Sequence, residues 1–125
     1  MPGLNLHPPI DTKTIQLMGH NNDSIDAYIA KPSIGGPFAS VIVAHHMPGW
    51  DEWCIEVTRR LAHHGYLAVC PNLHDRFGPG TAAEMSARVR DDGGQRDEFV
   101  IGDLQGTLDY VRNLDAVSYT HLTLP

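Results

Sequence analysis

One run in the chain, residues 40–53, determines how its central elements must follow one another. Residues 41–44 are apolar and mostly β-branched, which favours a strand covered on both faces. Pro48 and Gly49 prevent that strand from continuing. Asp51 then supplies a predicted N-cap for a helix. We therefore expect a buried strand that ends in a polar turn and passes into a helix.

The helix predicted after Asp51 is amphipathic and is followed at once by another strand. Its expected core-facing side carries Trp53, Val57 and Leu61, and the helix is expected to end at Gly65. Residues 66–70 form the second predicted strand. A strand, a helix and a strand in this order make the right-handed crossover of a parallel sheet. Such junctions are where α/β enzymes place their chemistry.

Turn residues and helical spacing predict the elements on either side of this unit. Residues 14–18 and 25–31 are expected to pair as an antiparallel hairpin, after a proline-rich tail or edge arm that runs to Asp11. Residues 82–89 are predicted to be helical, and a last helix is expected to begin near Asp97. The predicted core-facing residues of that last helix are Val100, Leu104, Leu108 and Val111, and its predicted solvent-facing residues are Asp103, Asp109 and Arg112.

Composition limits the class of protein. A chain of 125 residues with 42% hydrophobic and 19% charged residues is typical of one globular domain. A net charge of -6 argues against a general nucleic-acid binder. No segment has the pattern of a secretory signal or the length of a membrane span, so we expect a cytoplasmic protein without a membrane partner. Cys54 and Cys70 are predicted to be buried thiols rather than a disulfide or metal ligands.

Three motifs carry a family resemblance. They are His-His-Met-Pro-Gly-Trp-Asp-Glu-Trp at residues 45–53, His-His-Gly-Tyr at 63–66 and Cys-Pro-Asn-Leu-His-Asp-Arg at 70–76. In this order the chain resembles the dienelactone hydrolase (carboxymethylenebutenolidase) family of α/β-hydrolases, over roughly residues 14–115. The resemblance implies an α/β fold, specifically the N-terminal half of an α/β-hydrolase, in which an antiparallel hairpin leads into a parallel sheet with flanking helices.

The same resemblance implies an activity. Members of the family hydrolyse small-molecule esters or lactones through a covalent acyl-enzyme, with a Cys or Ser nucleophile, an Asp and a His, and they need no cofactor. The nucleophile lies on a sharp Gly-x-Ser/Cys-x-Gly turn between a strand and a helix. No serine or cysteine of this chain has that setting. We therefore expect residues 1–116 to be a partial hydrolase domain that lacks its catalytic triad and is inactive alone.

The last nine residues are interpreted separately. Residues 117–125 read Val-Ser-Tyr-Thr-His-Leu-Thr-Leu-Pro, and they look like a translated transposase adapter from a sequencing library. Their pattern is neither alternating nor helical, so no strand is expected there. We interpret them as a non-native tail, with a natural divergent tail as the alternative.

Three residues are candidates for the substrate site by their positions in the family, and Trp50 is added as a fourth. The backbone N–H of Met47 would be one of the two donors of the oxyanion hole, with an ordinary turn amide as the alternative. His46 stands where some members carry a glutamate and is expected to line the pocket as a hydrogen-bonding group, and Trp50 is expected to border it. Arg76 matches an arginine that holds a substrate carboxylate. The alternative for Arg76 is a surface ion pair, for example with Asp75.

Two other functions stay open at this point. Eight histidines make a zinc site conceivable. However, the two adjacent pairs, His45-His46 and His63-His64, point apart on a strand or a helix, and no metal-binding spacing is present, so no metal ligand is assigned. A small non-catalytic binding domain of unknown oligomeric state is the second alternative, and a p-nitrophenyl ester assay separates it from an esterase.

Overall fold

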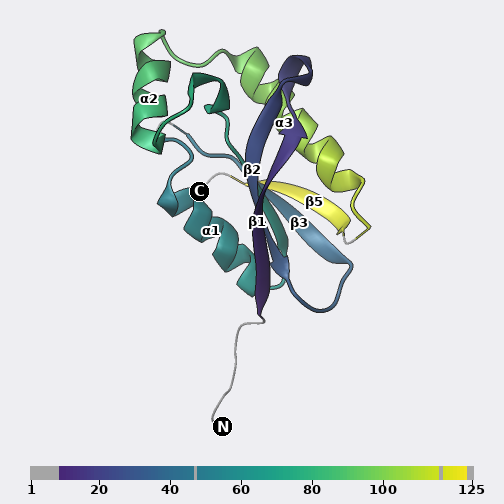
Figure 1. The fold of residues 1–125 in the computed structure, drawn as a ribbon. Helices are drawn as coiled ribbons and strands as arrows, with labels where there is room; N and C mark the ends of the chain where they lie inside the picture. Colours follow the sequence, from purple (N-terminus) through teal and green to yellow (C-terminus); the bar gives the residue numbers. More distant parts are fainter. Residues whose placement is uncertain (1–8, 47, 116, 124–125) are drawn as a thin grey trace.

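A five-stranded sheet with helices on both faces forms the molecule (Figure 1). The computed structural model describes residues 9–46, 48–115 and 117–123. Its elements are β1 (Ile10–Met18), a 3-10 turn (His20–Asn22), β2 (Ser24–Pro32), β3 (Phe38–Val43), α1 (Glu52–His63), β4 (Leu67–Pro71), a second 3-10 turn (Asp75–Phe77), α2 (Ala82–Asp91), α3 (Asp97–Arg112) and β5 (Val117–Thr123).

The strand order β1-β2-β4-β3-β5 confirms the predicted fold class. β1 and β2 pair as an antiparallel hairpin, with Ile10 opposite Pro32 and Met18 opposite Ser24. β2 runs antiparallel to β4, and β3 runs parallel to β4. The hairpin is longer at both ends than predicted. In particular, β1 begins at Ile10, inside the segment expected to be a tail up to Asp11.

The crossover helix α1 has the predicted caps, and two of its three predicted core residues, Val57 and Leu61, pack against the core. Asp51 accepts a hydrogen bond from the N–H of Cys54 (3.0 Å) and begins the helix. At its end, Gly65 has a φ of 101°, the left-handed conformation that glycine favours at this position. The buried residues are Cys54, Thr58 and Ala62. Trp53 is 56% exposed, so its assignment to the core was wrong. The buried residues, spaced four apart, begin one position after Trp53, which is about 100° further around the helix.

Two hydrophobic clusters pack on opposite faces of the sheet. The cluster under α1 contains Val41, Val43, Cys54 and Cys70, with Trp50, Val57 and Leu61 against it. The cluster under α3 contains Leu17, Ile25, Ala27, Ile29, Leu67, Val69 and Val111, with Tyr110 and Leu114 against it. Strand β4 supplies residues to both clusters, because successive side chains of a strand point to opposite faces. Burial on both faces is what the apolar composition of the central strands predicts.

Helix α3 buries one of its four predicted core residues, Val111, together with two polar residues that were not assigned to the core. Its buried residues are Asp103, Thr107 and Val111, and the side chain of Asp103 is fully buried. The expectation that Asp103 faces solvent was wrong. Spacing assigns a carboxylate to the wet side by default, but here the carboxylate has charged and hydrogen-bonding partners that compensate for its burial.

The backbones of α3 and the hairpin approach each other closely. A Cβ atom added at Gly106 would overlap the carbonyl oxygen of Met18, and one added at Gly102 would overlap the ring of His20. Only glycine permits this distance between the helix and the end of β1. The hairpin turn is thereby held against α3 at the edge of the sheet where parallel strands β3 and β4 end (Figure 1).

Residues 117–123 form a strand, contrary to the expectation from their pattern. β5 runs parallel to β3, with Ser40 opposite Thr120 and Val43 opposite Thr123. Backbone pairing with an existing strand is available to any non-proline sequence. The side-chain pattern of residues 117–123 therefore did not indicate the strand. The adapter origin of residues 117–125 is a statement about the DNA and stays a prediction, which sequencing across the codon of Ala116 would test.

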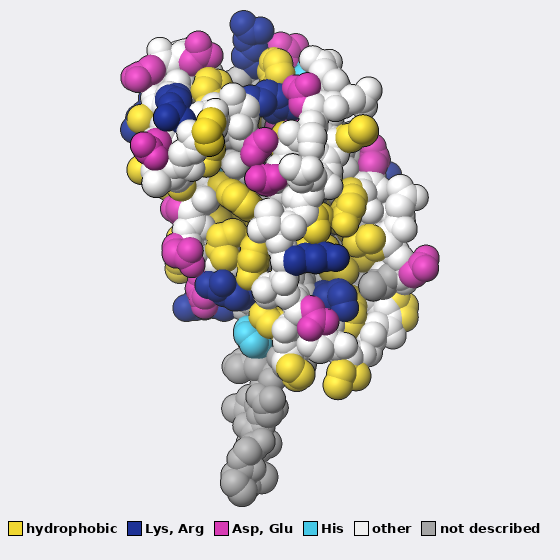
Figure 2. Space-filling model, in the orientation of Figure 1, with side chains coloured by type: hydrophobic (Ala, Val, Ile, Leu, Met, Phe, Trp, Pro, Cys, Tyr) yellow, Lys and Arg dark blue, Asp and Glu magenta, His cyan; other side chains and the backbone are white. Residues whose placement is uncertain are grey.

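On the face drawn in Figure 2, neither acidic nor basic side chains dominate the surface. Acidic and basic side chains are interspersed there, and apolar side chains gather over the middle of the face. Within the described parts of the chain, no helix is both long and apolar enough to cross a membrane.

The contact between α3 and the hairpin makes a stability prediction. Gly106→Ala should lower the free energy of unfolding by about 2 kcal/mol, because the overlap with the Met18 carbonyl outweighs the gain of about 1 kcal/mol in helix propensity. Urea unfolding followed by circular dichroism measures it. Gln105→Ala, at an exposed position of the same helix, is the control and should change stability by less than about 0.5 kcal/mol. A stabilised Gly106→Ala variant would contradict the packing.

Candidate functional site at the ends of β3 and β4

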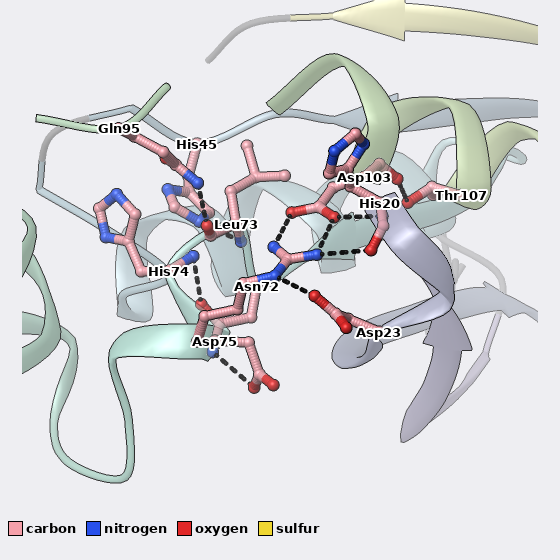
Figure 3. Close-up of polar contacts among 11 residues, drawn as sticks. His20, Asp23, His45, Asn72, Leu73, His74, Asp75, Gln95, Asp103 and Thr107 are labelled. Atoms are coloured by element: carbon pink, nitrogen blue, oxygen red, sulfur yellow. Dashed lines mark hydrogen bonds and ion pairs between the residues drawn. The ribbon is translucent and has the colours of Figure 1, made fainter. Parts of the chain in front are cut away.

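Polar side chains converge where the parallel strands β3 and β4 end (Figure 3). His45 follows β3, and residues 72–76 follow β4. Ser40 lies opposite Leu67 in the parallel ladder, so the two carboxyl ends reach the same edge of the sheet. In open α/β sheets this edge is where ligands bind.

His45 joins the two loops. The N–H of Leu73 donates to Nε2 of His45 at 2.8 Å, and Nδ1 lies 3.1 Å from the carbonyl oxygen of His46. Because Nε2 accepts a backbone N–H, the proton of the neutral ring is on Nδ1, which therefore donates to His46. His45 as a whole residue is only 5% exposed. His45 is thus a two-ended bridge between the residues that follow β3 and those that follow β4.

The surroundings of His45 keep it uncharged. Burial lowers its pKa from 6.5 to about 4, against the hydrogen bond to the His46 carbonyl, which favours the charged form. The ring of His74 lies edge-on to it, with centroids 4.7 Å apart. Burial also lowers the pKa of His74. Nδ1 of His74 is buried and has no hydrogen-bond partner among the described residues.

The loop after β4 is held by side chains in addition to a backbone hydrogen bond to β2, from the N–H of Asn72 to the carbonyl of Asp26 (2.8 Å). The carbonyl of Leu73 accepts a hydrogen bond from the side-chain amide of Gln95, which lies between α2 and α3. The side chain of Asn72 accepts from the N–H of His74 at 3.1 Å and donates to Asp75 at 3.3 Å. Both backbone groups of Leu73 are therefore satisfied by side chains from other loops.

Arg76 lies at the centre of an ion-pair network with Asp23 and Asp103, and these two partners are labelled in Figure 3. Its two terminal nitrogens each lie 2.8 Å from a carboxylate oxygen of Asp103, and its Nε lies 2.7 Å from Asp23. It also donates to the carbonyl of His20 at 3.2 Å and packs 4.9 Å from the ring centroid of Phe99. Hydrogen bonds to Asp103, and then to Asp23, raise the pKa of Arg76. Arg76 therefore forms ion pairs, as the predicted alternative has it, but its partners are Asp23 and Asp103.

Among the described residues, Arg76 and Trp50 line two different hollows. Arg76 lines a cavity of about 190 Å³ together with Phe77, Gln95 and Phe99. Trp50 borders a groove of about 410 Å³ whose lining includes Asp26, Asn72 and Asp75. The Trp50 indole N–H donates to the carbonyl of Cys70 at 2.9 Å, which fixes its ring against the core. Burial, followed by the charge of Asp26, raises the pKa of Asp75 in this groove.

The turn predicted to supply the oxyanion donor is described only in part. Met47 lies outside the described residues. His46 is exposed, and its carbonyl oxygen accepts the N–H of Gly49 at 2.8 Å. His45 is buried whereas His46 is exposed, so the two neighbours lie in different environments.

The cysteines have the predicted state. Cys54 and Cys70 are both free and buried. A hydrogen bond with Cys54, followed by burial, raises the pKa of the Cys70 thiol, so it is protonated at neutral pH. Neither has the exposure that a nucleophilic thiolate needs. Across the described residues no group of three or more His, Cys, Asp or Glu side chains could hold a metal ion.

Sequence reasoning missed the residues that organise this edge, chiefly His45, Gln95 and Asp103. One signal was present for Asp103. It is spaced i, i+4 and i+8 with Thr107 and Val111 on a helix that also carries Gly102 and Gly106, and small residues on one side of a helix indicate close packing there. No local pattern indicated His45 or Gln95, because their partners are backbone groups distant in sequence.

Comparison with known proteins gives evidence that is independent of the geometry of the site. Residues 25–124 match the model of the Dienelactone hydrolase family. A Synechocystis protein classed with the carboxymethylenebutenolidases is 28% identical over 116 residues, which covers 86% of this chain and 46% of that protein. The carboxymethylenebutenolidase of Pseudomonas putida is 26% identical over 113 residues, which covers 82% of this chain and 45% of the enzyme.

Solved structures agree with the sequence matches. A Klebsiella pneumoniae protein classed with the dienelactone hydrolases has a TM-score of 0.76 and 25% identity, over 93% of this chain and 49% of that protein. The chain thus spans about half the length of the curated relatives it matches.

The buried His45 predicts an acid-sensitive fold. Its pKa is about 4 when folded and 6.5 ordinarily, so between these values the unfolded chain binds a proton that the folded chain does not. Stability should therefore be full above pH 6.5 and fall toward pH 4, by on the order of 3 kcal/mol from this residue. The lowered pKa of His74 acts in the same direction.

Urea unfolding at several pH values between 7 and 4.5 measures this loss. His45→Gln should flatten the dependence, whereas His46→Gln, at the exposed neighbouring position, should leave it unchanged. Equal pH dependence in the wild type and His45→Gln would contradict the assignment.

The network around Arg76 predicts a second stability effect. Arg76→Gln leaves the buried carboxylate of Asp103 without its ion pair and should cost about 3 kcal/mol in urea unfolding. Arg96→Gln is the matched control, because Arg96 is exposed and lies 4.0 Å from Glu98, and it should cost less than about 0.5 kcal/mol. Unchanged stability of Arg76→Gln would show that its contacts are not structural.

Proposed function

Because the chain belongs to the dienelactone hydrolase family, we propose that the intact protein that contains it hydrolyses ester or lactone bonds of small molecules. The observation that carries this proposal is the family match over residues 25–124. Its chemistry is acyl transfer, in which a nucleophile attacks the carbonyl carbon, the alcohol leaves and water then hydrolyses the acyl-enzyme. The nucleophile, the Asp and the His belong, in this proposal, to the half of the relatives' length that the chain does not span.

This chain supplies one wall of the proposed site. The turn after β3 provides the N–H of Met47 as one oxyanion donor, which complements the N–H next to the nucleophile. The position of this turn at the carboxyl edge of two parallel strands supports that role. His46 borders the same turn, and its exposed side chain is available to a bound substrate.

Arg76 and Trp50 are proposed to border the substrate from two sides of the loop after β4. Arg76 has five N–H donors, and four hydrogen bonds to Asp23, Asp103 and His20 use four of them. A substrate carboxylate would therefore meet an arginine whose direction is already set by Asp103. Trp50 offers an aromatic edge to the groove that it lines.

The proposal predicts a difference between this chain and the intact protein. The 125-residue chain should hydrolyse a p-nitrophenyl ester no faster than a buffer blank, because none of its serines or cysteines has the Gly-x-Ser/Cys-x-Gly setting. The intact protein should show turnover with a burst of nitrophenol that reports acylation. Turnover by the chain alone would contradict the placement of the triad, and an inactive intact protein would contradict the hydrolase assignment.

A further inference from the structure

Strand β1 lies at one edge of the sheet, and its pairing with β2 determines which of its backbone groups are already used. The N–H of Ser33 donates to the carbonyl of Pro9 at 2.9 Å, and the N–H of Gly19 donates to the carbonyl of Asp23 at 2.7 Å. In an antiparallel ladder, pairs that exchange hydrogen bonds alternate with pairs that do not. The odd-numbered residues of β1 therefore bind β2, and the even-numbered residues direct their N–H and C=O groups away from it.

The outward backbone groups in the first half of β1 are available for pairing. They belong to Ile10, Thr12 and Thr14, each of which has both a donor and an acceptor. Among the described strands none lies beyond β1, and Thr12 and Thr14 are exposed. The end of the strand is different, because the carbonyl of Met18 lies against Gly106 of α3. A strand edge of this kind is a template for pairing with another strand.

The charges of β1 favour pairing with a copy of itself in one register. Asp11 and Lys13 stand on either side of Thr12 and are both exposed. When two β1 strands run antiparallel about Thr12, Asp11 of each strand lies opposite Lys13 of the other. A centre at residue 11 or 13 would instead place two like charges opposite each other, and a centre at Thr14 would place Lys13 opposite Ile15. Opposite charges stabilise a cross-strand pair, whereas like charges destabilise it.

The side chain of Asp11 is already held in place for such a contact. The hydroxyl of Ser33 donates to one of its carboxylate oxygens at 2.9 Å, and the ammonium of Lys31 lies 3.6 Å from the other. In the pair of strands the carboxylate would lie between Lys31 of its own copy and Lys13 of the second copy. A second positive partner is thereby added to an ordered side chain, which reduces the entropy that the contact costs.

We propose that a second copy of this chain docks on β1, so that two sheets join edge to edge about a two-fold axis at Thr12. Ile10 of each copy then exchanges two backbone hydrogen bonds with Thr14 of the other, and the two Thr12 residues exchange two more. Because both copies use the same segment, the contact closes as a dimer. The proposal does not depend on the proposed function, because no residue of the candidate site takes part.

Sedimentation equilibrium of the unmodified chain tests the association itself. Over about a hundredfold range of concentration, the mean mass should rise reversibly from that of the monomer toward that of the dimer. Amide hydrogen exchange then locates the contact. The amides of Thr12 and Thr14 should exchange about tenfold more slowly at high concentration than at low concentration, whereas those of Lys13 and Ile15, which are bonded to β2, should not change.

Three results of these measurements would overturn the proposal. The first is a chain that stays monomeric with the amides of Thr12 and Thr14 unprotected. The second is a dimer in which these two amides exchange as in the monomer, which would place the contact elsewhere, for example on the opposite edge strand β5. The third is protection of the two amides in a monomer, which would mean that another segment of the same chain occupies the edge.

Charge variants test the register. Lys13→Asp and Asp11→Lys each place like charges opposite one another, so each should weaken dimerisation about tenfold. An equal mixture of the two variants restores opposite charges at both positions and should dimerise as the unmodified chain does. Arg60→Asp is the control, because it makes the same charge change as Lys13→Asp at an exposed position of α1, and it should leave dimerisation unchanged.

The variants also allow the proposal to fail. Undiminished dimerisation of Lys13→Asp would overturn it, and so would a mixture of folded variants that does not dimerise. Circular dichroism shows whether each variant folds. If Asp11→Lys does not fold, Lys13→Asp and the exchange measurement on the unmodified chain decide the proposal.

Discussion

The ion pair between Arg76 and Asp103 is the interaction on which the arrangement of this domain depends. Asp103 is fully buried on α3, and its carboxylate also accepts the N–H of His20 at 2.8 Å. Arg76 comes from the loop after β4 and also binds Asp23 at the hairpin turn. Three segments distant in sequence are thereby joined at the edge of the sheet where the candidate site lies. A carboxylate at this depth is tolerated because its charge and its lone pairs have partners.

Most of the fold was predictable because local signals agree with the global arrangement. Residues 40–53 carry a β-branched run, Pro48 and Gly49, and an N-cap at Asp51, and each of these has the predicted local effect in the structure. The hairpin and the crossover were also predicted correctly, and the family resemblance is confirmed by the match over residues 25–124. Consistency of this kind between local pattern and tertiary structure is characteristic of natural sequences.

The errors share a physical cause, which is that pattern analysis treats polarity as exposure. Asp103 was assigned to solvent and is buried, and Trp53 was assigned to the core and is 56% exposed. In the candidate site, His45 and Gln95 act through backbone groups of Leu73 and His46, and a backbone partner leaves no trace in composition or spacing. The strand β5 was missed for a related reason, since its pairing with β3 is a property of the backbone.

The different environments of the two tryptophans give the chain its own optical reporter. Trp50 packs against the core of the crossover unit, and its indole N–H is bound to a carbonyl at the end of β4, whereas Trp53 lies on the surface three residues along the chain. Loss of the contact between the turn and β4 would change the emission of Trp50 while that of Trp53 stayed close to its value in water. Fluorescence of a Trp53→Phe variant would therefore follow the opening of the site's turn in real time, separately from unfolding of the whole sheet.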